Sequence, residues 1–306
     1  MHIIHDIENF EAPWKSCAVT PGVFDGLHKG HQALIHKLLK KRVDARVLLT
    51  YHPHPDLVLG KRKSAETYEL FTYEEKLALF QSYPLDAVVF LPFTPELARM
   101  TALRYLKEIL LGKLKASHIV IGYDQCFGRG RKGDFAFLKK MSRRYNYSVD
   151  RVKAVRRSGL VISSSQIRNS LANGQMETAA KLLGHDYFIT GLVVRGFQRG
   201  REMGFPTANL EVPRSKVLPM QGVYTARAEW GGRSYRAMVN IGTNPTFDGR
   251  QLTIEANLLD FNADLYGEQL RIHFRKRIRD EVKFDSMEAL IAQLHKDREV
   301  TLKEKL

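Results

Sequence analysis

The sequence predicts two domains of different fold class: an α/β domain on a doubly wound parallel sheet, then an antiparallel β-barrel that ends in a helix. Two observations support this division. Through about residue 185, short apolar runs alternate with amphipathic helical stretches, as in sheets covered by helices on both faces. From Tyr187 onward, runs rich in β-branched and aromatic residues follow one another closely, separated by glycine-containing turns. We therefore expect domains at residues 1–185 and 186–306.

The strands predicted for the first domain are continuous apolar runs, the pattern of parallel strands that are buried on both faces. These runs are residues 17–20, 47–51, 87–91 and 118–121. Amphipathic stretches lie between them. Apolar residues recur at helical spacing at Leu34, Ile35, Leu38 and Leu39, and residues 73–82 behave similarly.

The strands predicted for the second domain are residues 187–195, 222–230, 234–241, 252–261 and 270–274. Closure of such strands into a barrel removes exposed sheet edges. Residues 286–303 predict a closing helix, because Met287, Leu290, Ile291 and Leu294 share one face.

Composition excludes several classes of protein. The chain of 306 residues has 44% hydrophobic residues, enough for two packed cores, but no run of 18 uncharged residues that would cross a membrane. The first fifteen residues are acidic where a secretory signal needs a basic start. Cys17 and Cys126 are too few for a disulfide framework. We expect a cytoplasmic protein without a membrane partner, and the sequence leaves the oligomeric state open.

The formal net charge of +15 has one main source. Residues 129–168 contain twelve Lys or Arg against Asp134 and Asp150. Such a segment is compatible with polyphosphate binding, nucleic-acid binding or an ordinary solvated face. The sequence contains no helix-turn-helix, zinc-finger or RNA-binding aromatic signature, so we expect no nucleic-acid partner.

The most specific feature of the first domain is the segment Gly-Val-Phe-Asp-Gly-Leu-His-Lys-Gly-His at residues 22–31, between a predicted strand and a helix. Glycines at such a turn let a phosphate approach the backbone, and the helix N-terminus presents free N–H groups. His28 and His31 lie three residues apart, so both imidazoles can reach one anion. The alternative is a turn whose histidines only cap the helix.

This segment resembles the nucleotidylyltransferase superfamily, which attacks the α-phosphate of a nucleotide and expels pyrophosphate. The run Ser163-Ser164-Ser165, with Arg168 one turn later, resembles the serine-rich helix start at which that superfamily holds the outer phosphates. The resemblance implies a Rossmann-like domain in which His28 and His31 are catalytic. It also implies that ATP is bound by Gly22, Phe24, Asp25, Gly30, Ser163, Ser164, Ser165 and Arg168.

Two further segments resemble the flavin-adenylylating branch of that superfamily. One is Thr-Tyr-His-Pro-His-Pro at residues 50–55, which implies flavin binding by His52, Pro53 and Pro55. Taken without the family, His52 and His54 are candidate zinc ligands that lack a third partner. The other is Gly-Tyr-Asp-Gln-Cys-Phe-Gly at residues 122–128, which implies flavin binding by Asp124 and Phe127. In it, Gln125 stands where the family commonly has an aromatic residue, which puts flavin stacking in question.

The second domain resembles riboflavin kinase. The resemblance rests on the segments at residues 200–209, 222–224, 240–247, 255–261, 264–267 and 279–284. The whole chain therefore resembles the bacterial bifunctional riboflavin kinase/FMN adenylyltransferase family. This implies that riboflavin is phosphorylated to FMN and that FMN is adenylylated to FAD, with riboflavin, FMN and ATP as substrates and Mg²⁺ as the metal.

Candidate roles follow for the second site. Thr207 and Asn209 are two residues apart, so on an extended segment their oxygens point the same way. Hard Mg²⁺ accepts such neutral oxygens when nucleotide phosphates supply the remaining charge and geometry. The resemblance implies that both bind metal and ATP, that Gly204 binds ATP, and that Arg279 binds flavin. It also implies that Glu255 is the base for the riboflavin 5′-hydroxyl. The alternative for Glu255 is a solvent-facing residue of an alternating strand.

Three other functions remain open at this point. The first is an enzyme in which one of the two halves is inactive. The second is a flavin-sensing regulator that binds nucleic acid through the basic segment. The third is a transferase of the same superfamily that acts on a different small substrate.

Overall fold

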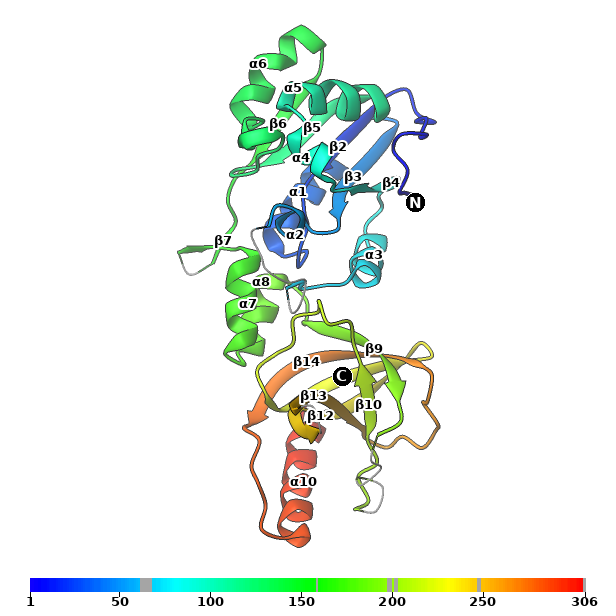
Figure 1. Cartoon of the computed structure of the whole chain (residues 1–306), viewed down its shortest axis with the longest axis vertical. Coiled ribbons are helices and arrows are strands. Elements are labelled where there is room, and N and C mark those ends of the chain that lie inside the picture. The colour runs from blue at the N-terminus through cyan, green and yellow to red at the C-terminus, as the bar shows by residue number, and fades with distance from the viewer. Residues whose placement is uncertain (61–67, 158, 197–199, 201–202, 247–248, 305–306) are drawn as a thin grey trace. The chain divides into compact units, whose positions relative to one another are not determined.

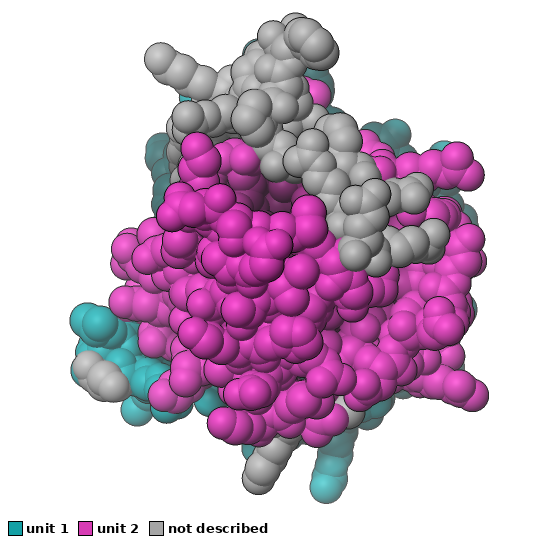
Figure 2. Space-filling view, turned by 90° about the horizontal axis from the view of Figure 1, so that it is seen from below, with its two compact units in different colours: residues 1–164 teal, residues 165–306 magenta. Residues whose placement is uncertain are grey.

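The computed structural model describes residues 1–60, 68–157, 159–196, 200, 203–246 and 249–304, and the side chains of 244–246 and 249–251 are outside the description. The chain forms two compact units, residues 1–164 and 165–306. Figure 1 shows their elements, and Figure 2 colours the two units.

The first unit contains a six-stranded sheet in the order β1-β4-β3-β2-β5-β6, with every pair parallel. The strands are β1 (His2–Ile4), β2 (Cys17–Pro21), β3 (Ala45–His52), β4 (Ala87–Pro92), β5 (Ala116–Gly122) and β6 (Ser148–Val152). From β2 the chain builds outward through β3 and β4, then crosses to the other side of β2 to form β5 and β6. This order confirms the predicted doubly wound sheet and places its switch point between β2 and β5.

Alternate residues of the central strands supply two separate hydrophobic cores. Val47 and Leu49 of β3 pack on one face, with Leu106 and Leu110 among their neighbours. Leu48 packs on the other face, in the core that contains residues of the first and third helices. Because side chains alternate across a strand, a continuous apolar run fills both layers.

The helices of this unit begin at recognisable capping residues. Thr72 and Glu75 form a reciprocal capping box at α3, which confirms the helix predicted at residues 73–82. The elements are α1 (Lys29–Leu39), α2 (Pro55–Val58), α3 (Tyr73–Gln81), α4 (Pro95–Arg99), α5 (Ala102–Arg104), the π-helical η1 (Tyr105–Lys113), the 3₁₀ turn η2 (Arg129–Arg131), α6 (Phe135–Tyr145) and the ribbon of β7 (Arg156–Arg157) and β8 (Leu160–Val161).

The second unit contains a closed antiparallel barrel in the order β10-β13-β12-β11-β14-β9, which confirms the predicted barrel. Its elements are α7 (Ser164–Ala172), α8 (Met176–Leu183), β9 (Phe188–Val194), β10 (Ala208–Glu211), β11 (Gly222–Trp230), β12 (Arg233–Thr246), β13 (Gly249–Leu258), β14 (Gln269–Arg279) and α10 (Met287–Leu302).

The terminal helix α10 packs by a face that differs from the predicted one. Ile291 and Leu294 pack against the cluster of Phe205, Met238 and Leu259, as expected, but Met287 is 57% exposed. The most buried residues of α10 are Asp297 and Thr301, one and two turns further on. The packed face therefore contains a buried carboxylate.

The helices α7 and α8 belong with the barrel. The backbone N–H of Met220 donates to the carbonyl of Leu171 at 2.9 Å, and α8 packs against β14. The boundary between the two compact units therefore lies between Ser164 and Ser165. The functional domain boundary at 185/186 stays a prediction.

The two boundaries make different predictions for fragments. We expect fragment 186–306 to fold and keep its pocket, but to unfold with a free energy lower than that of fragment 165–306 by at least about 3 kcal/mol. The longer fragment also buries Ile167, Leu171 and Leu183, and each such side chain stabilises by about 1.5–3 kcal/mol. Urea denaturation of both fragments measures the difference. Equal stabilities would show that α7 and α8 add nothing to the barrel.

Candidate active sites

The loop between β2 and α1 is fixed by a buried aromatic ring and by a hydrogen bond from β3. Phe24 is fully buried and lies at a positive φ of 51°. Its ring occupies the space beside Gly22, where an added Cβ would lie 2.9 Å from a ring carbon. The Thr50 hydroxyl donates to the Val23 carbonyl at 3.0 Å. A residue larger than glycine at position 22 would displace this ring, so the motif's glycine has a packing reason.

His28 and His31 form a stacked pair at the start of α1. Their ring centroids are 3.7 Å apart with an interplanar angle of 15°. His28 is the N-cap of α1, and its Nδ1 accepts from the backbone N–H of His31 at 3.3 Å. Gly30 keeps the space beside this ring open, because its Cβ would lie 3.0 Å from His28 Cε1. Capping and stacking thus give both imidazoles fixed positions at a helix N-terminus.

Burial keeps both imidazoles uncharged. It lowers the pKa of His28 to about 4, although the nearby Asp25 carboxylate acts in the opposite direction. Burial and the neighbouring His28 hold the pKa of His31 well below its usual range. Because Nδ1 of neutral His28 accepts a hydrogen bond, its proton is on Nε2, which is a donor. Nδ1 of His31 is buried and has no hydrogen-bond partner among the described residues.

Two of the other phosphate-site candidates, Asp25 and Ser164, make contacts that fix the loop. The Asp25 carboxylate accepts from the backbone N–H of Leu70 at 3.0 Å, and the backbone carbonyl of Asp25 accepts from the Ser164 hydroxyl at 2.7 Å. Both contacts fix the loop. Ser163 and Ser164 belong to the unit of His28, whereas Ser165 and Arg168 belong to the second unit. A phosphate role for these residues stays a prediction.

A cavity of about 360 Å³ lies beside the carboxyl ends of the sheet strands in the first unit. Pro55 and Phe127, two predicted flavin ligands, line it. The predicted ligands His52, Pro53 and Asp124 are exposed and are not among the lining residues.

Aromatic side chains that the sequence did not single out complete this cavity: Tyr51, Phe93 and Tyr105. The hydroxyls of Tyr51 and Tyr105 are 2.8 Å apart, and Phe127 packs on Tyr105 with centroids 5.0 Å apart. A signal for Tyr51 was its place at the end of a buried strand. His54 also lines the cavity, where its Nδ1 accepts from the Asp56 N–H. Within the described part of the chain, no three His, Cys, Asp or Glu side chains form a metal-binding group.

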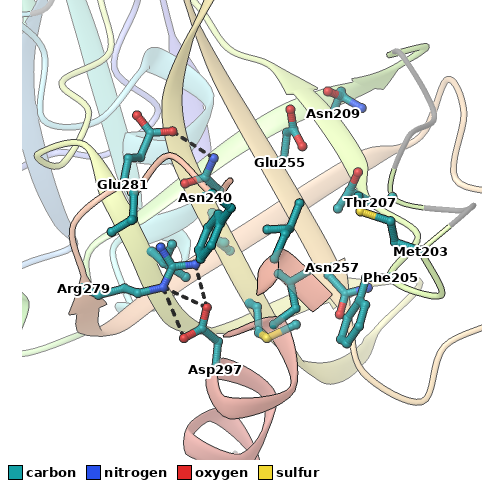
Figure 3. Close-up of a pocket in the computed structure, with 18 residues that line it drawn as sticks. Met203, Phe205, Thr207, Asn209, Asn240, Glu255, Asn257, Arg279, Glu281 and Asp297 are labelled. Atoms are coloured by element: carbon teal, nitrogen blue, oxygen red, sulfur yellow. Dashed lines mark hydrogen bonds and ion pairs between the residues drawn. The ribbon is translucent and has the colours of Figure 1, made fainter. Parts of the chain in front are cut away.

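The barrel contains a cavity of about 350 Å³ in which strand pairing aligns the candidate residues (Figure 3). Asn209 of β10 pairs with Glu255 of β13, and Glu255 pairs with Asn240 of β12. Val223 of β11 continues the row to Arg279 of β14. Paired residues of antiparallel strands point to the same face, so this row lines the cavity. Glu255 is half-buried there, between two amide side chains, and is no solvent-facing strand residue.

Thr207 and Asn209 both line this cavity, as their spacing predicted. Thr207 lies just before β10, and Asn209 lies within it. A second cavity of about 580 Å³ adjoins the first, since Met203, Phe205 and Asn257 line both. Gly204 lines the second cavity, at the rim that joins the two.

Arg279 lines the barrel cavity with its guanidinium already engaged. Its Nε and Nη2 donate to Asp297 Oδ2 at 3.0 and 2.8 Å, and Nη1 donates to the Asp280 carbonyl at 3.0 Å. Asp297 is 1% exposed and also accepts from Gln293. Loss of one partner of such a buried pair typically costs 3–5 kcal/mol. Arg279 therefore fastens α10 to the barrel, and few of its donors remain for a flavin.

Asn240 and Glu281 are cavity residues that the sequence did not single out. The Asn240 Nδ2 donates to Glu281 Oε1 at 3.2 Å. Glu281 also fills the space over Gly242, where a Cβ would lie 1.9 Å from its Oε1. The position of Asn240 opposite Glu255 depends on strand register, which one segment alone does not reveal.

Comparison with known proteins identifies the family. Residues 10–166 match the FAD synthetase family, and residues 183–304 match the riboflavin kinase family. The chain is 35% identical over 309 residues to a bifunctional riboflavin kinase/FMN adenylyltransferase of Escherichia coli K12, covering 99% of this chain and 97% of the relative. The chain belongs to the bifunctional riboflavin kinase/FMN adenylyltransferase family.

A second relative has the same description, and one solved structure shares the fold. A Bacillus subtilis protein of the same description is 34% identical over 312 residues, covering 99% of this chain and 97% of the relative. A crystal structure described as a macrolide-efflux protein from Streptococcus pneumoniae is 32% identical, covers 100% of both chains and has a TM-score of 0.90. It has the fold of this bifunctional enzyme. Among the described residues of the present chain, no helix is long and apolar enough to span a membrane.

The buried His28 makes stability depend on pH. Its pKa is about 4 in the folded chain against an ordinary 6.5, so the unfolded chain binds a proton more readily as the pH falls below 6.5. We therefore expect folding stability to be lost between about pH 6.5 and pH 4, with about 3 kcal/mol from this residue. His28→Gln should shrink this loss. Urea denaturation of both proteins at pH 7 and pH 4.5 measures it, and parallel pH dependence would contradict the assignment.

Proposed function

We propose that this chain phosphorylates riboflavin in the barrel cavity and adenylylates FMN at the loop between β2 and α1, each with ATP. The observation that supports the first assignment most strongly is the row of Asn209, Glu255 and Asn240 on three neighbouring strands. It places one carboxylate between two amides in the barrel cavity. A cavity of this size suits a small-molecule substrate.

In the kinase step, the Glu255 carboxylate takes the proton from the riboflavin 5′-hydroxyl. The hydroxyl oxygen then forms a bond to the γ-phosphorus of ATP, and the bond from that phosphorus to ADP breaks. General-base help of this kind contributes about 10²–10⁴-fold. The adjoining cavity, with Gly204 at the shared rim, is our assignment for ATP, because it lets the phosphates reach Thr207 and Asn209.

Activity with ATP generally involves a divalent metal, and we assign Mg²⁺ to Thr207 and Asn209. The Thr207 hydroxyl and Asn209 carbonyl are neutral hard oxygen donors that line one cavity. Mg²⁺ accepts such ligands when nucleotide phosphates and water complete its shell. When bound, it would neutralise charge on the transferring phosphate.

In the adenylylation step, a phosphate oxygen of FMN attacks the α-phosphorus of ATP and pyrophosphate leaves. The start of α1 supplies backbone N–H groups, and His28 supplies its Nε2–H. Donors held in place before reaction stabilise charge that develops on the phosphate oxygens. The aromatic cavity of Tyr51, Phe93 and Phe127 suits the flavin ring of FMN.

We also propose that the enzyme works in the cytoplasm. Cys17 is buried and Cys126 half-buried, and both are free thiols, which agrees with a reducing compartment.

The activity itself is tested by a time course with riboflavin, ATP and Mg²⁺, in which chromatography separates FMN and FAD. We expect FMN to form first and FAD to follow. Excess EDTA should abolish FMN formation, and added Mg²⁺ should restore it, because neutral Thr207 and Asn209 do not neutralise a triphosphate. Full kinase turnover in EDTA would contradict the metal assignment.

Substitutions in the two sites should separate the two activities. His28→Ala and His31→Ala should each lower kcat for FAD formation from FMN by about 10²-fold or more, because donors to the reacting phosphate are lost. Glu255→Gln should lower kcat for FMN formation by about 10²-fold, because the amide cannot take a proton. Steady-state assays of each half reaction provide the measurement.

Each variant serves as the control for the other. FMN formation should persist in the histidine variants, and FAD formation from supplied FMN should persist in Glu255→Gln. Loss of the kinase in a folded His28→Ala protein, or normal kinase turnover in Glu255→Gln, would refute the assignment of that residue.

A further inference from the structure

The strands at the switch point of the first unit separate before they end. The β2–β5 ladder pairs Cys17 through Val19 with Ala116 through Ile119 and stops there. On its other side, β2 stays paired with β3 as far as Pro21. The carboxyl ends of β2 and β5 therefore flank an unpaired gap, and the loop that carries His28 begins at the edge of this gap.

The side chain of Gln125 bridges this gap. Its Oε1 accepts from the backbone N–H of Gly122, the last residue of β5, at 3.0 Å. Its Nε2 donates to the carbonyl of Pro21, the last residue of β2. The orientation of the amide is fixed by chemistry, since Pro21 offers only an acceptor and Gly122 only a donor here. The bridge thus continues the β2–β5 connection beyond the last backbone pair.

Gln125 does not belong to the aromatic cavity. Its neighbours Cys126 and Phe127 line that cavity, but Gln125 is absent from the lining. Gln125 therefore contributes no surface to this cavity. Its amide instead makes two hydrogen bonds that connect β5 to β2, and an aromatic side chain cannot make both of them.

We propose that Gln125 is a positioning residue for adenylyl transfer, a polar connection that sets the separation of the ends of β2 and β5 and so the place of the loop with His28 and His31. This proposal rests on the proposed adenylyltransferase function. Displacement of reacting groups by about 1 Å can cost about 10²-fold in rate. The connection is adjacent to the loop, because Gly22 directly follows Pro21.

The test uses two variants of nearly equal shape. Gln125→Met keeps the length of the side chain but has neither donor nor acceptor. Gln125→Glu keeps the acceptor for Gly122, and its carboxyl donates to the Pro21 carbonyl only when it is protonated. Gln81→Met and Gln81→Glu are matched controls, because Gln81 is exposed at the end of α3. FAD formation from FMN and ATP is measured from pH 5 to pH 8, with riboflavin phosphorylation in the same samples.

We expect Gln125→Met to lower kcat for FAD formation by 10- to 100-fold, with KM for FMN and riboflavin phosphorylation changed less than about twofold. The activity ratio of Gln125→Glu to Gln125→Met should rise about tenfold as the pH falls, because acid restores the missing donor. His28 and the carboxylates of Asp25 and Asp124 near it are present in both variants, so the ratio removes the effects that the two variants share.

The proposal is overturned if Gln125→Met retains FAD formation within twofold of the wild type, or if the ratio of the two variants does not change with pH. A destabilised but correctly positioned site would show a pH-independent ratio and a lower melting temperature. If the wild-type chain forms no FAD from FMN, the proposed function fails before any variant is compared, so the two failures are distinguishable.

Discussion

Hydrogen bonding between neighbouring strands positions the residues of both proposed sites. In the barrel, Asn209, Glu255 and Asn240 meet only because β10, β13 and β12 pair in one register. A slip of one residue would turn Glu255 to the other face and leave no carboxylate between Asn209 and Asn240. In the first unit, the ladder between β2 and β5 stops at Val19, and the reactive loop starts where the strands diverge. The proposed kinase site depends on strand pairing that continues through it, and the proposed adenylylation site lies where the pairing of β2 with β5 has ended.

Burial then sets the charge of the groups that the strands position. Burial keeps His28 and His31 uncharged, so in the proposed adenylylation they would meet the phosphates as neutral groups and not as cations. In the barrel, the buried carboxylate of Asp297 is paired with Arg279 and accepts from Gln293. Both arrangements avoid an unpaired buried charge, whose desolvation would be expensive. They also leave Glu255 as the carboxylate at the centre of the cavity row.

The sequence predicted those features that depend on local pattern. Apolar runs revealed the central strands, and glycines beside histidines revealed the loop at residues 22–31. It did not reveal β6, a strand at the edge of the sheet that carries Asp150 and Arg151 and has no buried apolar run. It did not reveal Asn240 or Asp297 either. The role of Asn240 comes from its pairing with Glu255 on β13, and that of Asp297 from its ion pair with Arg279 on β14. The stripe predicted for α10 was incomplete for the same reason: a buried aspartate is recognisable only with its arginine in place.

The neutral state of His28 also limits which interactions the loop can make with a nucleotide in the proposed binding mode. To charge this imidazole at pH 7, a ligand must raise its pKa from about 4 by three units, which requires about 4 kcal/mol of preferential interaction. A single charge-assisted hydrogen bond contributes about 1.5–3 kcal/mol, so one phosphate contact is insufficient. If ATP binds here as proposed, its first phosphate meets a neutral Nε2–H, the backbone N–H groups and the positive end of α1. In the proposed complex, a ligand that places several phosphate oxygens at the loop, as ATP would, is needed to supply enough negative charge to protonate His28.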